Sequence, residues 1–339
     1  MAKQTTIHDI AKALGINSST VSRALNDHPR VSIKTKQKVF EMAKEMNYQP
    51  NVLAANLRTK RSNTLGIVVP HISRAFFSNV IAGVEEYAQQ KGFNVIIAQS
   101  KDMLERERKS VQTLMNSRVD GILISPALGN EDAQHIQEVI DRKTPVFFFD
   151  RHYKNIETTR VLMDDQQISA ALASNIIQQG AKRFLVLSGD LKTSIYQNRL
   201  QGINNMLADY ELPEAMVQET NLTYESSSAL IEQIVQEGSF EFDAVMAMND
   251  MAALGAQEAL KKAGFTIPDQ VLISGFSNEM FSRFSSPPIT TVDQNGDKLG
   301  YMAAKKIIDF IEDPDPIAVE ETSTLKSELI LRKSSQRYQ

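Results

Sequence analysis

The chain has 339 residues, of which 42% are hydrophobic and 23% are charged. These values are typical of a globular protein with two or three compact units. Cysteine is absent, which excludes disulfides and thiolate metal sites. No apolar run approaches the roughly 18 residues of a membrane helix. The N-terminal residues lead into a helical pattern without an apolar signal-peptide core, so we expect a cytoplasmic protein with no membrane partner.

Charge is distributed unevenly along the chain. Residues 1–62 contain eleven Lys and Arg and four Asp and Glu, a net charge of +7, whereas the remaining residues carry −11. A basic segment on an acidic body indicates that the basic segment meets a polyanion, although a chance fluctuation in composition is the alternative.

Residues 6–26 predict two short helices separated by a tight turn. Apolar residues recur at helical spacing in the first helix, which Thr6 and Asp9 can close with a capping box. Gly15 suits a left-handed C-cap, and Asn17 can cap the second helix. The outer face of that helix presents Ser19, Ser22, Arg23 and Asn26. Such groups hydrogen-bond base edges, so the pattern favours a DNA-reading helix-turn-helix over a helical hairpin with a merely solvated face.

A third helix is predicted over residues 33–46, with Ser32 as its cap. Residues 50–62 begin with a proline and end in a basic tail. This segment is too short to be helical alone in water, so we expect a helix only when a partner holds it. A plain basic linker is the alternative.

Strand-like and helix-like stretches alternate from residue 64 onward. Strands are predicted at 65–70, 94–98, 121–125, 145–150, 184–188, 244–248 and 271–276. Helices are predicted at 78–91, 104–117, 132–142, 166–179, 195–208, 226–237, 251–263 and 296–312. This rhythm predicts doubly wound α/β structure, with residues 161–165 crossing between two sheets. Ligands of such folds bind at the carboxyl ends of strands, here in a cleft between lobes.

A set of short motifs, in a fixed order over nearly the whole length, resembles the lactose-repressor (LacI/GalR) family of bacterial transcription regulators. The motifs are Thr6-Ile7-His8-Asp9-Ile10-Ala11, Ser19-Thr20-Val21-Ser22-Arg23-Ala24-Leu25-Asn26, Tyr48-Gln49-Pro50-Asn51, Leu65-Gly66-Ile67-Val68-Val69-Pro70, Phe76-Phe77, Val119-Asp120-Gly121-Ile122, Arg199-Leu200-Gln201-Gly202, Asn249-Asp250-Met251-Ala252-Ala253-Leu254-Gly255 and Pro287-Pro288-Ile289-Thr290-Thr291-Val292.

The resemblance implies a helix-turn-helix headpiece at residues 1–49, a hinge helix at 50–62 and an effector and dimerisation domain at 63–339. That domain is expected to have the two-lobed type I fold of periplasmic binding proteins, each lobe a doubly wound parallel sheet. The N-lobe would span about 63–162 and 292–321, and the C-lobe about 163–291 and 322–339. The family acts as homodimers on pseudo-palindromic operators.

The resemblance also implies which residues contact DNA. They are Thr6, Ser18, Ser19, Ser22, Arg23, Asn26, Ser32, Thr35, Ala54 and Leu57. Arg23 can make a bidentate guanine contact, and Ser32 and Thr35 match phosphate-contacting positions that can also be simple helix caps. Leu57 matches a wedge that enters the central base step from the minor groove. Ala55-Asn56 replaces the commoner Arg-Ser, which puts a contact from position 55 in doubt.

A second set of residues is implied for the effector cleft. It comprises Phe76, Phe77, Asp102, Ser125, Asp150, Arg199, Leu222, Asn249 and Ser277. Arg199 and Asp150 are the strongest polar anchors, whereas Asn249 can be only a helix cap and Phe76 and Phe77 only lobe core. Ser277 stands where the family commonly has an aspartate, which makes room for an anionic group on the ligand. We therefore expect a sugar or sugar acid.

The sequence favours a repressor whose hinge folds on DNA under control of the effector; an activator of the same family is an alternative. A second alternative is a small-molecule binding protein without a DNA role, which the basic headpiece disfavours. A third is an enzyme, but neither dinucleotide-binding nor phosphate-cradling glycine motifs occur. The five histidines show no metal-binding spacing, so we expect no metal, no cofactor and no catalytic residue.

Overall fold

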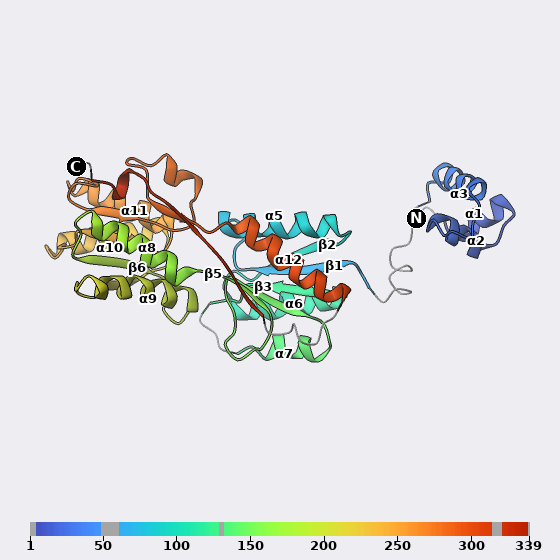
Figure 1. The fold of residues 1–339 in the computed structure, drawn as a ribbon, viewed down its shortest axis with the longest axis horizontal. Helices are drawn as coiled ribbons and strands as arrows, with labels where there is room; N and C mark the ends of the chain where they lie inside the picture. Colours follow the sequence, from blue (N-terminus) through green and yellow to red (C-terminus); the bar gives the residue numbers. More distant parts are fainter. Residues whose placement is uncertain (1–4, 49–60, 129–131, 314–320, 338–339) are drawn as a thin grey trace. The chain divides into compact units, whose positions relative to one another are not determined.

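The computed structural model describes residues 5–48, 61–128, 132–313 and 321–337. They belong to two compact units, which divide the sequence between Ser62 and Asn63. The first unit, the headpiece, is helical, and the second unit, the body, contains parallel β-sheets covered by helices (Figure 1). Within the described residues, no helix is long and apolar enough to span a membrane.

The headpiece contains three short helices around a thin core. They are α1 (Ile7–Leu14), α2 (Ser18–Leu25) and α3 (Ile33–Glu45). Gly15 ends α1 with φ of 64°, the left-handed conformation predicted for it. The buried side chains are mostly small, and a core of this size gives only marginal stability. They are Ile10, Ala11, Val21, Ala24, Val31, Val39 and Ala43.

The first lobe of the body, the N-lobe, is built on a six-stranded parallel sheet of order β11-β5-β4-β3-β1-β2. Its strands are β1 (Thr64–Val69), β2 (Asn94–Gln99), β3 (Gly121–Ile124), β4 (Val146–Phe149), β5 (Arg160–Met163) and β11 (Thr322–Leu325). Strands β3 and β4 are buried along their whole length. That burial follows from their continuous apolar runs, because parallel sheets are covered on both faces.

Helices cover both faces of the N-lobe sheet. On one side α5 (Ala75–Gln90) packs against α12 (Gly296–Glu312), and α6 (Leu104–Asn116) and α7 (Gln134–Asp141) lie on the other (Figure 1). Glycine lets α5 and α12 approach closely, since a Cβ atom at Gly83 would lie 1.9 Å from the Asp297 carbonyl oxygen. The predicted doubly wound architecture is therefore confirmed for this lobe.

The second lobe, the C-lobe, has a four-stranded parallel sheet of order β7-β6-β8-β9. Its strands are β6 (Phe184–Ser188), β7 (Met216–Glu219), β8 (Ala244–Ala247) and β9 (Leu272–Ser274). Its helices are α8 (Asp165–Gln178), α9 (Ser194–Asp209), α10 (Tyr224–Gln236) and α11 (Asp250–Lys262), with short 3₁₀ turns η1 (Met280–Arg283) and η3 (Lys333–Ser335).

The crossings between the lobes agree with the prediction at one place and differ from it at another. The first crossing falls at Asp164, near the end of the predicted stretch 161–165, because β5 belongs to the N-lobe sheet and α8 begins at Asp165. Strand β11 pairs with β5, so the N-lobe extends to Leu325 and not to 321. Near the other crossings, β10 (Thr291–Asp293) and β12 (Glu328–Ile330) form an antiparallel pair.

Several elements also differ from the predicted ones. Helix α5 begins at Ala75, before the predicted 78, and α7 begins at Gln134, after the predicted 132. Strand β7 was not predicted, because it is a short edge strand in which Met216 and Glu219 are exposed and Val217 is only half-buried. The long periodic helices and the buried strands were predicted correctly because their burial produces a clear sequence pattern.

Candidate functional site

The outer face of α2 is the exposed polar surface of the headpiece. Val21 and Ala24 are completely buried, so the opposite face of the helix is held outward. Ser19, Arg23 and Asn26 are exposed on that face. The side chains of Ser19 and Arg23 make no hydrogen bond within the described residues. These two side chains are therefore available to a partner.

Other predicted DNA-contacting residues make local hydrogen bonds. Ser18 Oγ lies 2.8 Å from His8 Nδ1. The Asn26 side-chain amide donates to the Ser22 carbonyl oxygen at 2.7 Å. Each of these bonds lies on the protein surface, where exchange for a bond to DNA costs little because water already competes for the same groups.

The helix caps agree with the sequence except at Asn17. Thr6 Oγ1 donates to Asp9 Oδ2 at 2.7 Å and completes the predicted capping box. Ser32 Oγ accepts a hydrogen bond from the Thr35 amide at 3.2 Å. Both residues therefore take part in the N-cap of α3. Asn17 stands at the N-cap of α2 but makes no side-chain cap bond, which corrects the prediction. Ala54 and Leu57 lie outside the described residues.

A cavity of about 380 Å³ lies between the lobes of the body. Its walls come from the N-terminal end of α5, the end of β4, helix α9 and the loops that follow β7, β8 and β9. This position agrees with the general rule for ligands of open α/β sheets. Seven of the nine predicted effector residues line it: Phe76, Phe77, Asp150, Arg199, Leu222, Asn249 and Ser277.

Arg199 is held in the cavity wall by three contacts. Its Nε donates to Asp165 Oδ1 at 2.7 Å, its Nη1 donates to the Met248 carbonyl oxygen at 3.0 Å, and its guanidinium carbon lies 3.6 Å from the centre of the Phe276 ring. Nη2 makes no bond to the described residues, so the fixed guanidinium can offer that nitrogen to a ligand.

Asp150 is the matching acceptor from the N-lobe. It is 5% exposed and accepts a hydrogen bond from Ser125 Oγ at 3.0 Å. Burial raises its pKa to about 6, an effect that the neighbouring Arg151 opposes. Ser125 is itself completely buried and does not line the cavity, so its position beneath Asp150 differs from the predicted contact with ligand.

Arg151 is a cavity residue that the sequence analysis missed. It is 4% exposed, and its Nη1 donates to Asp102 Oδ1 and, at 3.1 Å, to the Pro126 carbonyl oxygen. Burial acts to lower the pKa of Arg151, but Asp102 and Asp150 outweigh it and raise that pKa. Its place directly after Asp150 at the end of a buried strand was the signal available in the sequence.

Four of the predicted effector residues have backbone conformations that are rare for residues other than glycine. The φ angles are 56° at Asp102, 60° at Asp150, 53° at Leu222 and 104° at Ser277. All four lie in loops that follow parallel strands. Such conformations persist where the surroundings impose them, and they cluster at binding sites.

The remaining predicted residues combine structural and lining roles. The Asn249 side chain accepts from the Ala252 amide at 2.7 Å as the cap of α11 and donates to the Leu222 carbonyl oxygen at 2.9 Å. Ser277 Oγ donates to Gln294 Oε1 at 2.8 Å. Phe76 and Phe77 belong to the N-lobe core as well as to the cavity wall, so both interpretations of the aromatic pair hold.

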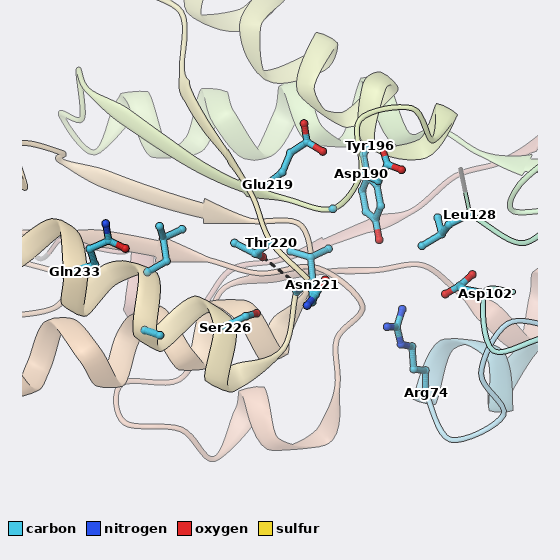
Figure 2. Close-up of a pocket in the computed structure, with 14 residues that line it drawn as sticks. Arg74, Asp102, Leu128, Asp190, Tyr196, Glu219, Thr220, Asn221, Ser226 and Gln233 are labelled. Atoms are coloured by element: carbon cyan, nitrogen blue, oxygen red, sulfur yellow. Dashed lines mark hydrogen bonds between the residues drawn. The ribbon is translucent and has the colours of Figure 1, made fainter. Parts of the chain in front are cut away.

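A second cavity of about 730 Å³ adjoins the first and shares Arg74, Tyr196 and Leu222 with it. Asp102 lines this second cavity rather than the first. Figure 2 shows Arg74, Asp102 and Leu128 of the N-lobe on one side and Asn221 and Ser226 of the C-lobe on the other. The sequence analysis also missed Arg74, at the N-cap of α5, and Tyr196, in the first turn of α9, because no local pattern shows which residues face a neighbouring lobe.

Comparisons with known proteins decide the family. Residues 6–51 match the model of the bacterial regulatory proteins of the lacI family. Residues 62–334 match the model of periplasmic binding proteins and the sugar binding domain of the LacI family. The chain belongs to the LacI family. It is thus a bacterial transcriptional regulator, with a DNA-binding helix-turn-helix and a ligand-binding domain.

Individual LacI-family members match along most of their length. The ribose operon repressor of Haemophilus influenzae is 30% identical over 333 residues, covering 97% of this chain and 98% of that protein. The transcriptional regulator DegA of Bacillus subtilis is 30% identical over 300 residues, covering 88% of each. The lac repressor dimer bound to operator and an anti-inducer is 25% identical, with a TM-score of 0.89 over 99% of this chain and 100% of that one.

The body also contains no group of three or more His, Cys, Asp or Glu side chains that could hold a metal ion, as far as the described residues extend. The polar groups of the cavity can form hydrogen bonds and ion pairs with a ligand. A fixed donor at Arg199 and a fixed acceptor at Asp150 suit a ligand that carries several hydroxyl groups.

Proposed function

We propose that this chain is a transcriptional repressor whose affinity for operator DNA is set by a sugar or sugar acid bound between the lobes. The observation that carries this proposal is the composition of the cavity wall, where Asp150 comes from the N-lobe and Arg199 from the C-lobe. A ligand bonded to both lobes favours one lobe arrangement over another. That differential affinity is what allosteric control requires.

The cavity fits a ligand of monosaccharide size, and it can accommodate an acidic group on that ligand. Its volume of about 380 Å³ lies in the lower part of the range for small-molecule sites. Phe76 and Phe77 supply an apolar wall, and their rings pack edge to face with centroids 5.1 Å apart. Ser277 supplies a hydroxyl that already donates to Gln294, so this position adds no negative charge. The same cavity is also lined by two carboxylates and by two cations that can pair with an anionic ligand, namely Glu225, Glu279, Arg74 and Arg151.

The headpiece would place α2 in the major groove. Arg23 is the exposed cation on that helix, and a guanidinium there can read guanine through two hydrogen bonds. The net charge of +7 over residues 1–62 supports phosphate neutralisation, so operator affinity should fall steeply with salt. A protein with this role acts where DNA is, and we infer a cytoplasmic location.

We also infer that the chain works as a homodimer on a pseudo-palindromic operator. Met280 and Phe284 are 77% and 78% exposed on the C-lobe. Ile97 is 44% exposed on β2, which is an edge strand of the N-lobe sheet. Contiguous apolar patches mark association surfaces, and Met280 and Phe284 lie together at the 3₁₀ turn η1. Sedimentation of Phe284→Ser should show a weakened dimer, whereas Tyr210→Ser, at an aromatic residue that is 46% exposed, should sediment like the parent.

The link between cavity and headpiece would be the segment 50–62, in which Leu57 is the proposed minor-groove wedge. Most of this segment lies outside the described residues, so its role rests on the family resemblance. Replacing Leu57 with Ala should reduce DNA bending as well as operator affinity. Unchanged bending in the variant would remove Leu57 from this role.

The test of the whole proposal is a thermal-shift screen of the full chain against sugars and sugar acids, followed by operator titration by fluorescence anisotropy. A cavity ligand should raise Tm by mass action and shift operator affinity. Linkage demands that operator DNA change the ligand affinity by the same factor. A ligand that raises Tm without any effect on operator affinity would contradict allosteric control. The proposed role involves binding without turnover, in keeping with the regulatory function of the family.

A further inference from the structure

A third cavity, of about 490 Å³, lies at another part of the boundary between the lobes. Its N-lobe wall is the segment after β4, which includes Arg151, His152 and Lys154, and its C-lobe wall is Lys192, Thr193 and the start of α9. It shares Arg151 with the 380 Å³ cavity and Leu128 with the 730 Å³ cavity. The predicted effector residues do not line it.

The charge of this third cavity differs from that of its neighbours. Arg151, Lys154 and Lys192 line it, and no carboxylate is present among its described lining residues. The charge of Arg151 is offset by Asp102 and Asp150, but Lys154 and Lys192 have no ion-pair partner in the described part of the chain. The cavity therefore carries uncompensated positive charge, to which an anion is attracted.

Unpartnered polar atoms are concentrated in the same wall. Thr193 is 7% exposed and Arg151 is 4% exposed, yet Thr193 Oγ1 and Arg151 Nε have no hydrogen-bond partner among the described residues. His152 Nδ1 is buried and unpartnered as well. Arg151 Nε faces Asp150 Oδ2 at 3.8 Å and His152 Nδ1 can itself accept a bond, so the Thr193 hydroxyl is the buried donor beside this cavity that has no acceptor among the described residues.

The start of α9 adds backbone donors. Thr193 stands at the N-cap of this 16-residue helix but makes no side-chain cap bond. The first amides of a helix have no partner within the helix, and the helix dipole favours negative charge at this end. Burial, Arg160 and Lys154 together lower the pKa of His152, which agrees with an excess of positive charge around it.

We propose that this cavity binds a phosphate oxyanion, held by the N-terminal end of α9, Thr193, Lys154 and Lys192. The oxyanion would accept from the Thr193 hydroxyl after a side-chain rotation, and from the exposed ammonium groups of the two lysines. Because Arg151 borders both this cavity and the 380 Å³ cavity, an anion here would act on the same guanidinium that holds Asp102. This site is separate from the proposed effector site and does not depend on it.

The experiment uses the full-length protein and measures binding of inorganic phosphate by calorimetry, with chloride at matched ionic strength as the reference. We expect phosphate to bind and to raise Tm. The charge-reversed variant Lys154→Glu/Lys192→Glu should bind phosphate at least about tenfold more weakly, because two charge-assisted bonds are lost. Lys182→Glu is the control, since Lys182 is exposed, lies outside the cavity and forms no ion pair with the described residues.

A second variant tests the hydroxyl alone. Thr193→Val keeps the side-chain shape and removes an unsatisfied buried hydroxyl, so the ligand-free variant should be at least as stable as the parent. Its phosphate affinity should nevertheless be several-fold lower. Phosphate binding that is no stronger than chloride binding, or that persists unchanged in both variants, would overturn the proposal.

Binding of a hexose phosphate, with the unphosphorylated hexose as reference, shows whether the oxyanion is free phosphate or part of a phosphorylated metabolite. Tighter binding of the hexose phosphate than of inorganic phosphate, lost in the same two variants, would identify a phosphorylated metabolite. Equal binding of the two phosphates, with the same losses, would identify free phosphate. Hexose phosphate binding that survives both variants would place it elsewhere and count against the site.

Discussion

The headpiece and the body differ in where their polar side chains lie, on the surface in the headpiece and also in the interior of the body. Among the described residues, every buried polar or charged side chain belongs to the body. The headpiece keeps its polar groups on the surface, in caps and short local bonds, around a core of seven mostly small buried side chains. The body instead buries ion pairs such as Arg199 with Asp165.

The difference corresponds to two kinds of recognition. A surface that meets DNA gains from exposed donors, because they exchange bonds to water for bonds to phosphates and bases. A cavity that selects a small ligand gains from groups already fixed in place, because little ordering remains to be done on binding. The following variants test this contrast, from the largest expected effect to the smallest.

The largest effect is expected for Ile10→Ala in the headpiece core. Ile10 is completely buried, and such a truncation costs about 2–5 kcal/mol. A three-helix unit has little stability to lose, so operator binding should be abolished. Unfolding of the body, followed by circular dichroism in urea, should remain that of the parent. A loss of body stability in this variant would contradict the separation into two units.

Arg199→Ala should be the most destabilising single change in the cavity wall. It leaves Asp165, which is 4% exposed, without its partner, and removing one member of a buried ion pair costs about 3–5 kcal/mol. Urea unfolding of the body measures the loss. The double variant Asp165→Ala/Arg199→Ala should recover part of the stability but not ligand binding. Equal stability of single and double variants would show that the pair is not coupled.

Arg23→Ala should weaken operator binding by about 1–3 kcal/mol, which is about 5- to 150-fold, without changing Tm. Arg23 is exposed and makes no hydrogen bond within the described headpiece, so its loss removes no folded-state contact. Anisotropy titrations on operator and on unrelated DNA provide the measurement. Lys44→Ala, at an exposed position of α3, is the matched control. An equal loss on both DNAs would make Arg23 a phosphate contact only.

Asp150→Asn should have the smallest effect, visible in its pH dependence. Burial raises the pKa of Asp150 to about 6 in the folded state, above the value of 3.8 for a free carboxyl group. The folded state therefore binds the proton more tightly, and this group's contribution to stability falls as pH rises from about 4 to 6. The asparagine variant does not titrate, so it should gain stability relative to the parent across that window. A constant difference from pH 4 to 7 would contradict a raised pKa.

Local features of the sequence predicted local structure well. Gly15 ends α1 and Ser32 caps α3 because caps depend on residues a few positions apart. Asn17 stands at the predicted N-cap position of α2, but its side chain makes no cap bond, which the sequence pattern did not reveal. Short strands such as β7 and β11 escaped prediction because half of their residues are exposed and they carry no continuous apolar run.

The sequence alone predicted the long helices, the buried strands and the basic headpiece, and the family resemblance supplied seven of the nine proposed effector residues that line the cavity. Periodicity, capping and charge can be read from residues that are close together in the sequence. The carboxyl ends of the predicted strands also indicate the edge of a parallel sheet at which a ligand binds. Only the tertiary structure decided that Arg151 lies against Asp102 and Arg199 against Asp165, across separations of 49 and 34 residues. These pairings depend on strand order and lobe packing, which no local pattern encodes, and they give the cavity its charge.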